Sequence, residues 1–148
     1  MFRNILVPTD GSVPSRRAIR CAVRLAREQK ARITGFYVGP PWRLPVGYTE
    51  YAPPEVLSSR EHATAVKKAA ARILGAVGKA AAAARVPCRC RYVMGEHPYA
   101  EIIKAARRDR CDVIVIASHG RRGISRLLLG SQTSKVLAHS PVPVLVCR

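Results

Sequence analysis

The sequence predicts one α/β domain over residues 1–148, with an open five-stranded parallel sheet and helices on both of its faces. Short apolar segments alternate with longer segments of helical periodicity along the whole chain. One short segment, residues 112–116, is almost wholly apolar, which is typical of a central strand buried on both faces. A chain of 148 residues can bury a core that needs no disulfide or metal.

The first half of the chain supplies two strands and two helices. The apolar run 5–7 predicts the first strand. In 13–29, apolar residues recur every three or four positions opposite a row of arginines, which predicts an amphipathic helix that Ser12 caps. Residues 31–38 predict the second strand. A loop with two proline pairs and the only Trp separates this strand from a predicted helix at 56–85.

The second half supplies three strands and two helices. The alternating segment 86–94 predicts the third strand, and Pro98 suits the first turn of the next helix. The apolar segment 112–116 predicts the fourth strand. A loop with two glycines then leads to a short helix at 131–139 and a last strand at 142–147.

The chain is strongly basic, with 26 Lys and Arg against 9 Asp and Glu, a formal charge of +17. Such a charge attracts nucleic acid, anionic membranes or phosphorylated small molecules. The basic residues are spread along the chain, however, and a solvated basic surface explains them as well. Aromatic residues make up only 5%, which argues against the stacking platforms of nucleic-acid binders.

The five cysteines include no C-x-x-C pair and are odd in number, so they fit neither a disulfide framework nor a zinc site. Cys88 and Cys90 would lie on one face of a strand, and the favoured interpretation is core or half-buried thiols in a reducing compartment. The first apolar run is too short for a signal peptide, and no segment is long enough to span a membrane. We therefore expect a soluble, cytoplasmic protein that does not bind membranes.

The P-loop and G-x-G-x-x-G patterns of nucleotide-binding proteins are absent from the sequence. The strongest remaining functional signal is the segment from Ala117 to Ser131. It follows the most apolar strand and ends at a helix N-terminus, where free N–H groups favour an anion. Gly120 and Gly130 can adopt positive φ and let backbone approach a ligand. An ordinary surface loop with turn glycines explains the spacing equally well.

This segment resembles the signature G-x₂-G-x₉-G-[ST] of the universal stress protein family. Gly120 matches the second glycine, Gly130 and Ser131 match the final pair, and Ala117 replaces the first glycine. Residues 4–12, 93–95 and 140–146 also resemble family segments, so the resemblance spans the chain. It implies an adenine nucleotide alpha hydrolase-like fold with strand order 3-2-1-4-5, and it implies ATP as ligand, with Mg²⁺.

The resemblance also implies a site at the carboxyl ends of the first and fourth strands. Asp10 would lie near the ribose or a bound metal, although capping of the following helix is an open alternative. Val38 would contact adenine through its backbone, and Met94 would line the same apolar slot. For His119 a structural hydrogen bond is favoured over phosphate contact or a role as base. The predicted nucleotide contacts are Pro8, Thr9, Asp10, Val38, Met94, Ala117, His119, Gly120, Arg121, Arg122, Gly123, Gly130, Ser131, Gln132 and Thr133.

The predicted function is that of an ATP-binding stress-response regulatory protein, with at most slow ATP hydrolysis and no assigned catalytic residue or protein metal cluster. The alternative is a homodimeric interaction module with weak nucleotide binding or none. In the family's strand order the last strand lies at a sheet edge, so Val142, Val144 and Val146 are expected to form an exposed apolar edge that pairs in a homodimer. Binding to nucleic acid is the weakest of the three hypotheses.

Overall fold

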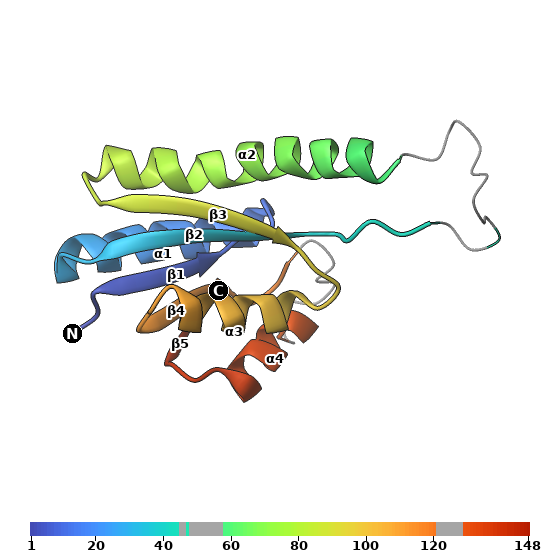
Figure 1. The fold of residues 1–148 in the computed structure, drawn as a ribbon. Coiled ribbons are helices and arrows are strands. Elements are labelled where there is room, and N and C mark those ends of the chain that lie inside the picture. Colours follow the sequence, from blue (N-terminus) through green and yellow to red (C-terminus); the bar gives the residue numbers. More distant parts are fainter. Residues whose placement is uncertain (45–46, 48–57, 121–128) are drawn as a thin grey trace.

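The computed structural model describes residues 1–44, 47, 58–120 and 129–148. It contains a parallel sheet in the order β3-β2-β1-β4-β5, which confirms the predicted topology (Figure 1). The strands are β1 (Asn4–Pro8), β2 (Arg32–Gly39), β3 (Cys88–Met94), β4 (Val113–Ala117) and β5 (Val144–Cys147). The helices are α1 (Val13–Gln29), α2 (Ser59–Ala83), α3 (Pro98–Arg108) and α4 (Ser131–His139).

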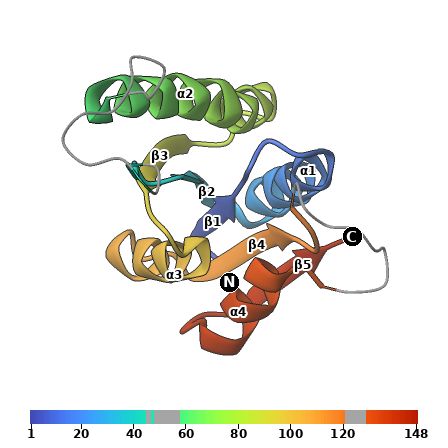
Figure 2. The same ribbon diagram turned by 90° about the vertical axis from the view of Figure 1, so that its right-hand side faces the viewer.

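The sheet lies between two helical layers, with α1 and α2 on one face and α3 and α4 on the other (Figures 1 and 2). One apolar cluster packs beneath α1 and the C-terminal half of α2, and a second packs beneath α3 and α4. Every residue of β1 and β4 is buried, as their apolar sequences predict for central strands. The two central strands thus form a rigid base for the segments that leave their carboxyl ends.

Two helices begin with serine caps. The Ser12 hydroxyl accepts a hydrogen bond from the Ser15 N–H, as predicted for α1. Ser58 caps α2 in the same way through the Glu61 N–H, and the Glu61 carboxylate accepts in return from the Ser58 N–H. The helix therefore starts at Ser59, later than predicted, because an extended Ser58 cannot belong to it. Val56, the predicted start, lies outside the described residues.

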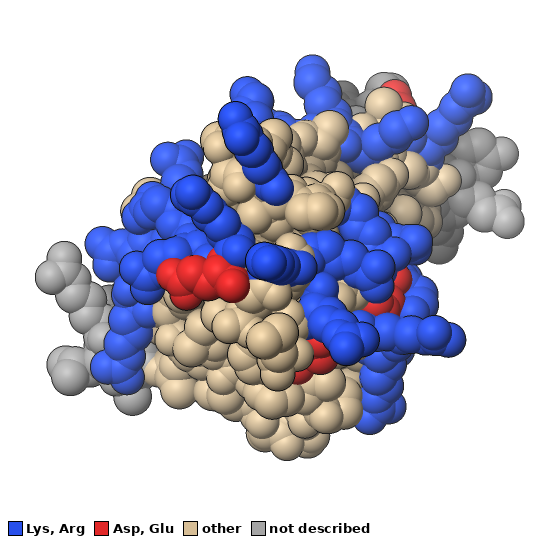
Figure 3. Space-filling model, turned by 90° about the vertical axis from the view of Figure 1, so that its left-hand side faces the viewer, with Lys and Arg blue, Asp and Glu red and all other residues tan. Residues whose placement is uncertain are grey.

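At the C-terminal ends of α1, α2 and α3 a basic residue has a left-handed backbone conformation. Lys30, Arg85 and Arg110 have φ of 53°, 57° and 50°, in the left-handed region where glycine is the usual choice. Arg85 also explains why β3 starts two residues later than predicted, since the chain still turns out of α2 there. These residues follow helix C-termini, which lie with the amino ends of the strands (Figure 1). Figure 3 shows Lys and Arg over much of that side of the molecule.

The last strand, β5, is an edge strand as expected, but its apolar residues are distributed differently from the prediction. Val142, Val144 and Val146 are partly buried against the cluster beneath α3 and α4. Leu145, which points to the opposite face, is 41% exposed. The expected exposed row of three valines is therefore wrong, because the α4 layer extends far enough to cover that face of β5.

The interpretation of all five cysteines as core or half-buried thiols is also wrong for two of them. Cys111 is buried and Cys21 and Cys147 are half-buried, whereas Cys88 and Cys90 are exposed. Both exposed thiols belong to β3, the other edge of the sheet. Within the described ranges, no helix combines the length and the apolar character that crossing a membrane requires.

Candidate functional site

The carboxyl ends of β1 and β4 lie side by side, and the helices that come next in the chain, α1 and α4, lie on opposite faces of the sheet. From β1 the chain enters α1 on one face, and from β4 it leads to α4 on the other (Figure 2). In open α/β sheets such a divergence creates a crevice that binds ligands. The structure thus brings the two main predicted segments, 8–10 and 117–120, to one place.

The segment after β1 is organised by its own side chains. Thr9 is buried, and its N–H donates to the Phe36 carbonyl at 2.9 Å. Asp10 Oδ1 accepts from the Ser12 N–H at 3.0 Å and from the Ser15 hydroxyl at 2.9 Å. Asp10 therefore supports the start of α1, as the capping alternative predicts. Between Asp10 and Ser12, Gly11 has a φ of 79°, a conformation that favours glycine.

The segment after β4 is held at both of its described ends. The Gly130 N–H donates to the Ser118 carbonyl at 2.8 Å, and the Thr133 hydroxyl donates to the Ala117 carbonyl at 2.9 Å. Ala117 itself is a buried residue of an extended strand, so its position does not require the glycine that the family signature has there. The side chain of Thr133 is buried and acts within the protein rather than at the crevice.

Gly120 and Gly130 lie at close contacts and do not use the positive φ that is open to glycine. Neither has a left-handed backbone, and φ of Gly130 is −59°. A Cβ on Gly120 would lie 2.8 Å from Asp10 Oδ2. A Cβ on Gly130 would lie 3.3 Å from the Ser118 carbonyl oxygen and 3.4 Å from the His119 Cα. The glycines thus let the segments after β1 and β4 and the start of α4 approach one another.

The N-terminus of α4 opens toward this junction without a side-chain cap. Its first-turn N–H groups, on Ser131, Gln132 and Thr133, have no acceptor within the helix, so they and the helix dipole favour an anion there. The Gln132 side chain is directed elsewhere, because its Oε1 accepts from the Tyr99 N–H at 3.0 Å at the start of α3. Gln132 can therefore serve a ligand through its backbone N–H.

His119 lies in the wall of a hollow between the start of α1 and the chain's C-terminus. Its Nδ1 lies 2.9 Å from the Ser118 hydroxyl, the structural hydrogen bond that was favoured from the sequence. Its Nε2 is buried and has no hydrogen-bond partner among the described residues. The hollow has a volume of about 400 Å³ and is lined by Val13, Pro14, Arg17, Ser118, His119 and Arg148.

Arg17 and Arg148 bring two guanidinium groups to this hollow, and sequence reasoning missed both. Arg17 lies one helical turn after Val13, the first residue of α1, and so on the same side of the helix. This spacing is a signal in the sequence that could have identified Arg17 as a residue near the crevice. Arg148 gives no such signal, because only the pairing of β5 with β4 brings it near Ser118. Arg121, Arg122 and Gly123 lie outside the described residues.

The side chains of Val38 and Met94 lie on opposite faces of the sheet. Val38 packs on the α3 side of the sheet. Met94 pairs with Gly39, which faces Val66 of α2, so the two predicted contacts lie on opposite faces. Met94 is 45% exposed. The predicted contact of Val38 is through its backbone, which lies at the end of β2, so an adenine contact there stays a prediction, as does a contribution from Met94.

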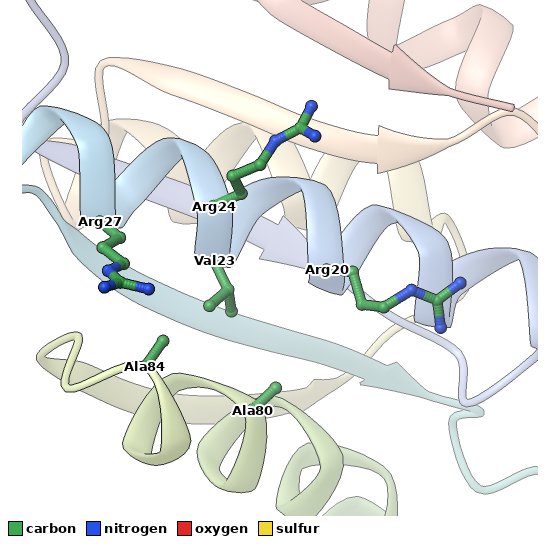
Figure 4. A pocket seen from close by; sticks show the side chains of 6 residues that line it. All are labelled: Arg20, Val23, Arg24, Arg27, Ala80 and Ala84. Atoms are coloured by element: carbon green, nitrogen blue, oxygen red, sulfur yellow. The ribbon is translucent and has the colours of Figure 1, made fainter.

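A second hollow, of about 280 Å³, lies far from this crevice between α1 and α2. Figure 4 shows Val23 pointing toward Ala80 and Ala84, with Arg20 and Arg27 at either end of the groove. Val23, Ala80 and Ala84 form its apolar part, and three arginines of α1 line it as well. Its three arginines make it a competing location for an anionic ligand.

These features define a class of protein: a small α/β protein whose crevice at the carboxyl edge combines an uncapped helix N-terminus with nearby cations. The chain belongs to the universal stress protein family, whose model matches residues 1–148. It is 35% identical over 154 residues to the universal stress protein YxiE of Bacillus subtilis, covering 100% of both chains.

Solved structures show the same fold. The universal stress protein UspA from Lactobacillus plantarum superimposes with a TM-score of 0.77 at 26% identity, covering 99% of this chain and 97% of the other. A universal stress protein solved in complex with cAMP has a TM-score of 0.71 at 24% identity and covers 99% and 97%.

Proposed function

We propose that this protein is a cytoplasmic regulatory protein that binds ATP with Mg²⁺ at the crevice between β1 and β4. The observation that carries the proposal is the uncapped N-terminus of α4, which the hydrogen bonds of Gly130 and Thr133 hold against the end of β4. A phosphate group there would accept from the first-turn N–H groups of Ser131, Gln132 and Thr133. The relative solved with cAMP supports an adenine nucleotide as the class of ligand.

The surrounding charges suit a triphosphate. Arg17 and Arg148 line the adjoining hollow, and Arg121 and Arg122 follow Gly120 in the sequence. The buried Nε2 of His119 offers a further polar atom to a ligand in the hollow. No three His, Cys, Asp or Glu side chains within the described residues converge as metal ligands. Mg²⁺ would accordingly arrive with the phosphates and take one protein carboxylate, for which Asp10 is placed at the crevice.

We assign the nucleotide a regulatory role because the crevice features that support binding are those of an anion site, and no residue is assigned a catalytic role. Hydrolysis, where it occurs, would then be slow. Pro8 and Thr9 would support the ligand through the backbone of the β1 end, and the end of β2 at Val38 would receive the adenine through its own backbone.

Calorimetric titration with ATP, ADP and AMP in the presence of Mg²⁺, at near-physiological salt, tests this proposal. We expect heat of binding with at least ATP, and a lower affinity for AMP, because fewer phosphates reach the helix N-terminus and the arginines. A folded sample that gives no heat with any of the three nucleotides would exclude the proposal and leave the interaction-module hypothesis.

We also propose a homodimer through β5, which is compatible with either function. β5 is an edge strand, so within the described sheet the backbone groups on its outer side have no partner strand. Its residue Leu145 is 41% exposed. Pairing of two β5 strands would cover both features. Light scattering at micromolar concentration should give about twice the monomer mass of 16.2 kDa. Leu145→Lys should reduce that mass, and a parent protein that is monomeric would refute the dimer.

A further inference from the structure

Cys88 and Cys90 form an exposed pair of thiols on β3. The period of a strand places both side chains on one face, and their sulfur atoms lie 4.0 Å apart. That face is the α2 side, because Cys90 pairs with Gly35 and lies over it, 3.1 Å from where a Cβ of Gly35 would be. The Cys90 thiol also lies 3.7 Å from the Leu74 carbonyl of α2. The pair therefore contacts β2 and α2 through Cys90, and both thiols are nevertheless exposed to solvent.

The two thiols are electronically unequal. The hydrogen bond from the Cys88 thiol lowers the pKa of Cys90 to about 7, although burial opposes this. The same hydrogen bond and burial raise the pKa of Cys88. The lowered pKa favours the thiolate of Cys90, the nucleophilic form of cysteine, over that of Cys88. The other thiols with a shifted pKa remain protonated near neutral pH, since burial raises the pKa of Cys111 to about 11 and that of Cys147 to about 12.

We propose that Cys90 is a site of reversible oxidation by hydroperoxides and that Cys88 is its resolving thiol. In the first step the Cys90 thiolate attacks one peroxide oxygen, the O–O bond breaks, and the leaving hydroxide or alkoxide takes a proton. Cys90 becomes a sulfenic acid, and the peroxide is reduced to water or an alcohol. In the second step the Cys88 sulfur displaces the Cys90 hydroxyl, its proton leaves with that hydroxyl as water, and a disulfide joins the two residues.

The strand geometry sets the character of this disulfide. Because Cys88 and Cys90 are two residues apart on a strand, their Cα atoms are about 6.6 Å apart. This distance is near the upper end of the range that disulfides span. β3 has a partner strand on one side only, so it can contract locally with the loss of few hydrogen bonds. A bridge formed in this way is strained, and strained exposed disulfides are readily reduced. The modification should therefore reverse with mild thiol reductants.

Peroxide treatment followed by thiol-trapping mass spectrometry tests the proposal. With about one equivalent of H₂O₂ at pH 7, the parent should lose two thiols, both in residues 88–90, and regain them with dithiothreitol. Trypsin cleaves after Arg89, so its two products should stay joined in the oxidised sample alone. Cys88→Ser should instead accumulate a sulfenic acid that dimedone labels, and Cys90→Ser should resist oxidation at Cys88. In the parent, the rate of thiol loss should rise with pH as the thiolate fraction of Cys90 increases.

Cys21→Ser is the matched control, because Cys21 is half-buried on α1 and should leave the reaction unchanged. Circular dichroism checks that each variant is folded. Three outcomes would overturn the proposal: equal oxidation of Cys90→Ser and the parent, first oxidation at Cys21 or Cys147, or a disulfide that joins two chains rather than Cys88 to Cys90. None of these outcomes bears on ATP binding, which the crevice on the other strands would still provide.

Discussion

Gly130→Val should lower the affinity for ATP by at least ~10-fold, about 1.4 kcal/mol, and leave the charge of +17 unchanged. The backbone conformation of Gly130, with φ of −59° and ψ of 146°, is accessible to valine, so the effect is not one of backbone strain. It arises because the new side chain would meet the Ser118 carbonyl and the His119 Cα. The 2.8 Å hydrogen bond from the Gly130 N–H to Ser118 would open, and the N-terminus of α4 would move away from the crevice. Calorimetric titration of parent and variant measures the change.

Gly75→Val provides the matched control, since a Cβ at Gly75 of α2 would meet nothing within 4 Å. This variant makes the same chemical change far from the crevice and should bind ATP as the parent does. Circular dichroism must show both variants folded. Equal ATP affinity in Gly130→Val and the parent would mean that the junction of β4 with α4 is not the nucleotide site.

Asn4→Ala should reduce the free energy of unfolding by about 2 kcal/mol, because it removes a buried polar side chain whose partners stay buried. Asn4 is 1% exposed, and its Nδ2 donates to the Asp109 carbonyl at 2.7 Å. Its Oδ1 accepts from the hydroxyl of Thr34, also buried, at 3.1 Å. These bonds tie β1 to β2 and to the turn before β4 at the amino edge of the sheet. Urea denaturation of parent and variant gives the difference.

The pair with Thr34 offers an internal check. In a Thr34→Val background the hydroxyl partner is absent, so Asn4→Ala should cost less than in the parent, with a coupling of at least about 0.5 kcal/mol. A loss below about 0.5 kcal/mol for Asn4→Ala in the parent would contradict the assigned role. ATP affinity should stay unchanged, since Asn4 lies at the end of β1 remote from the crevice.

The elements of the fold were predictable because they depend on local patterns. Residues 112–116 are apolar throughout, and β4 is buried throughout. The arginine row of 13–29 marks the outer face of α1 correctly. The order of the strands came from the resemblance to the family, because an apolar sequence can mark a strand as central but does not say which strands lie beside it.

What could not be predicted depends on contacts between distant segments. The family's strand order places β3 at a sheet edge, but neither that order nor the alternation within β3 reveals how far α2 covers its side chains, so the exposure of Cys88 and Cys90 was not predicted. Gly120 suggests a left-handed turn by composition, whereas the structure gives it no left-handed φ and places it against the side chain of Asp10, 110 residues earlier in the chain. Asn4 looks like an ordinary polar residue before a strand, and only the fold brings Asp109 and Thr34 to it.

An NMR titration of ¹⁵N-labelled protein with ATP and Mg²⁺ tests most directly that the crevice binds the nucleotide. We predict the largest amide shifts at Asp10, at 118–120 and at 130–133, because these residues surround the N-terminus of α4. Residues of the α1–α2 groove, such as Val23 and Ala80, should shift little, since that groove offers arginines but no helix N-terminus. The largest shifts in that groove, or no shifts at millimolar ATP, would contradict the assignment.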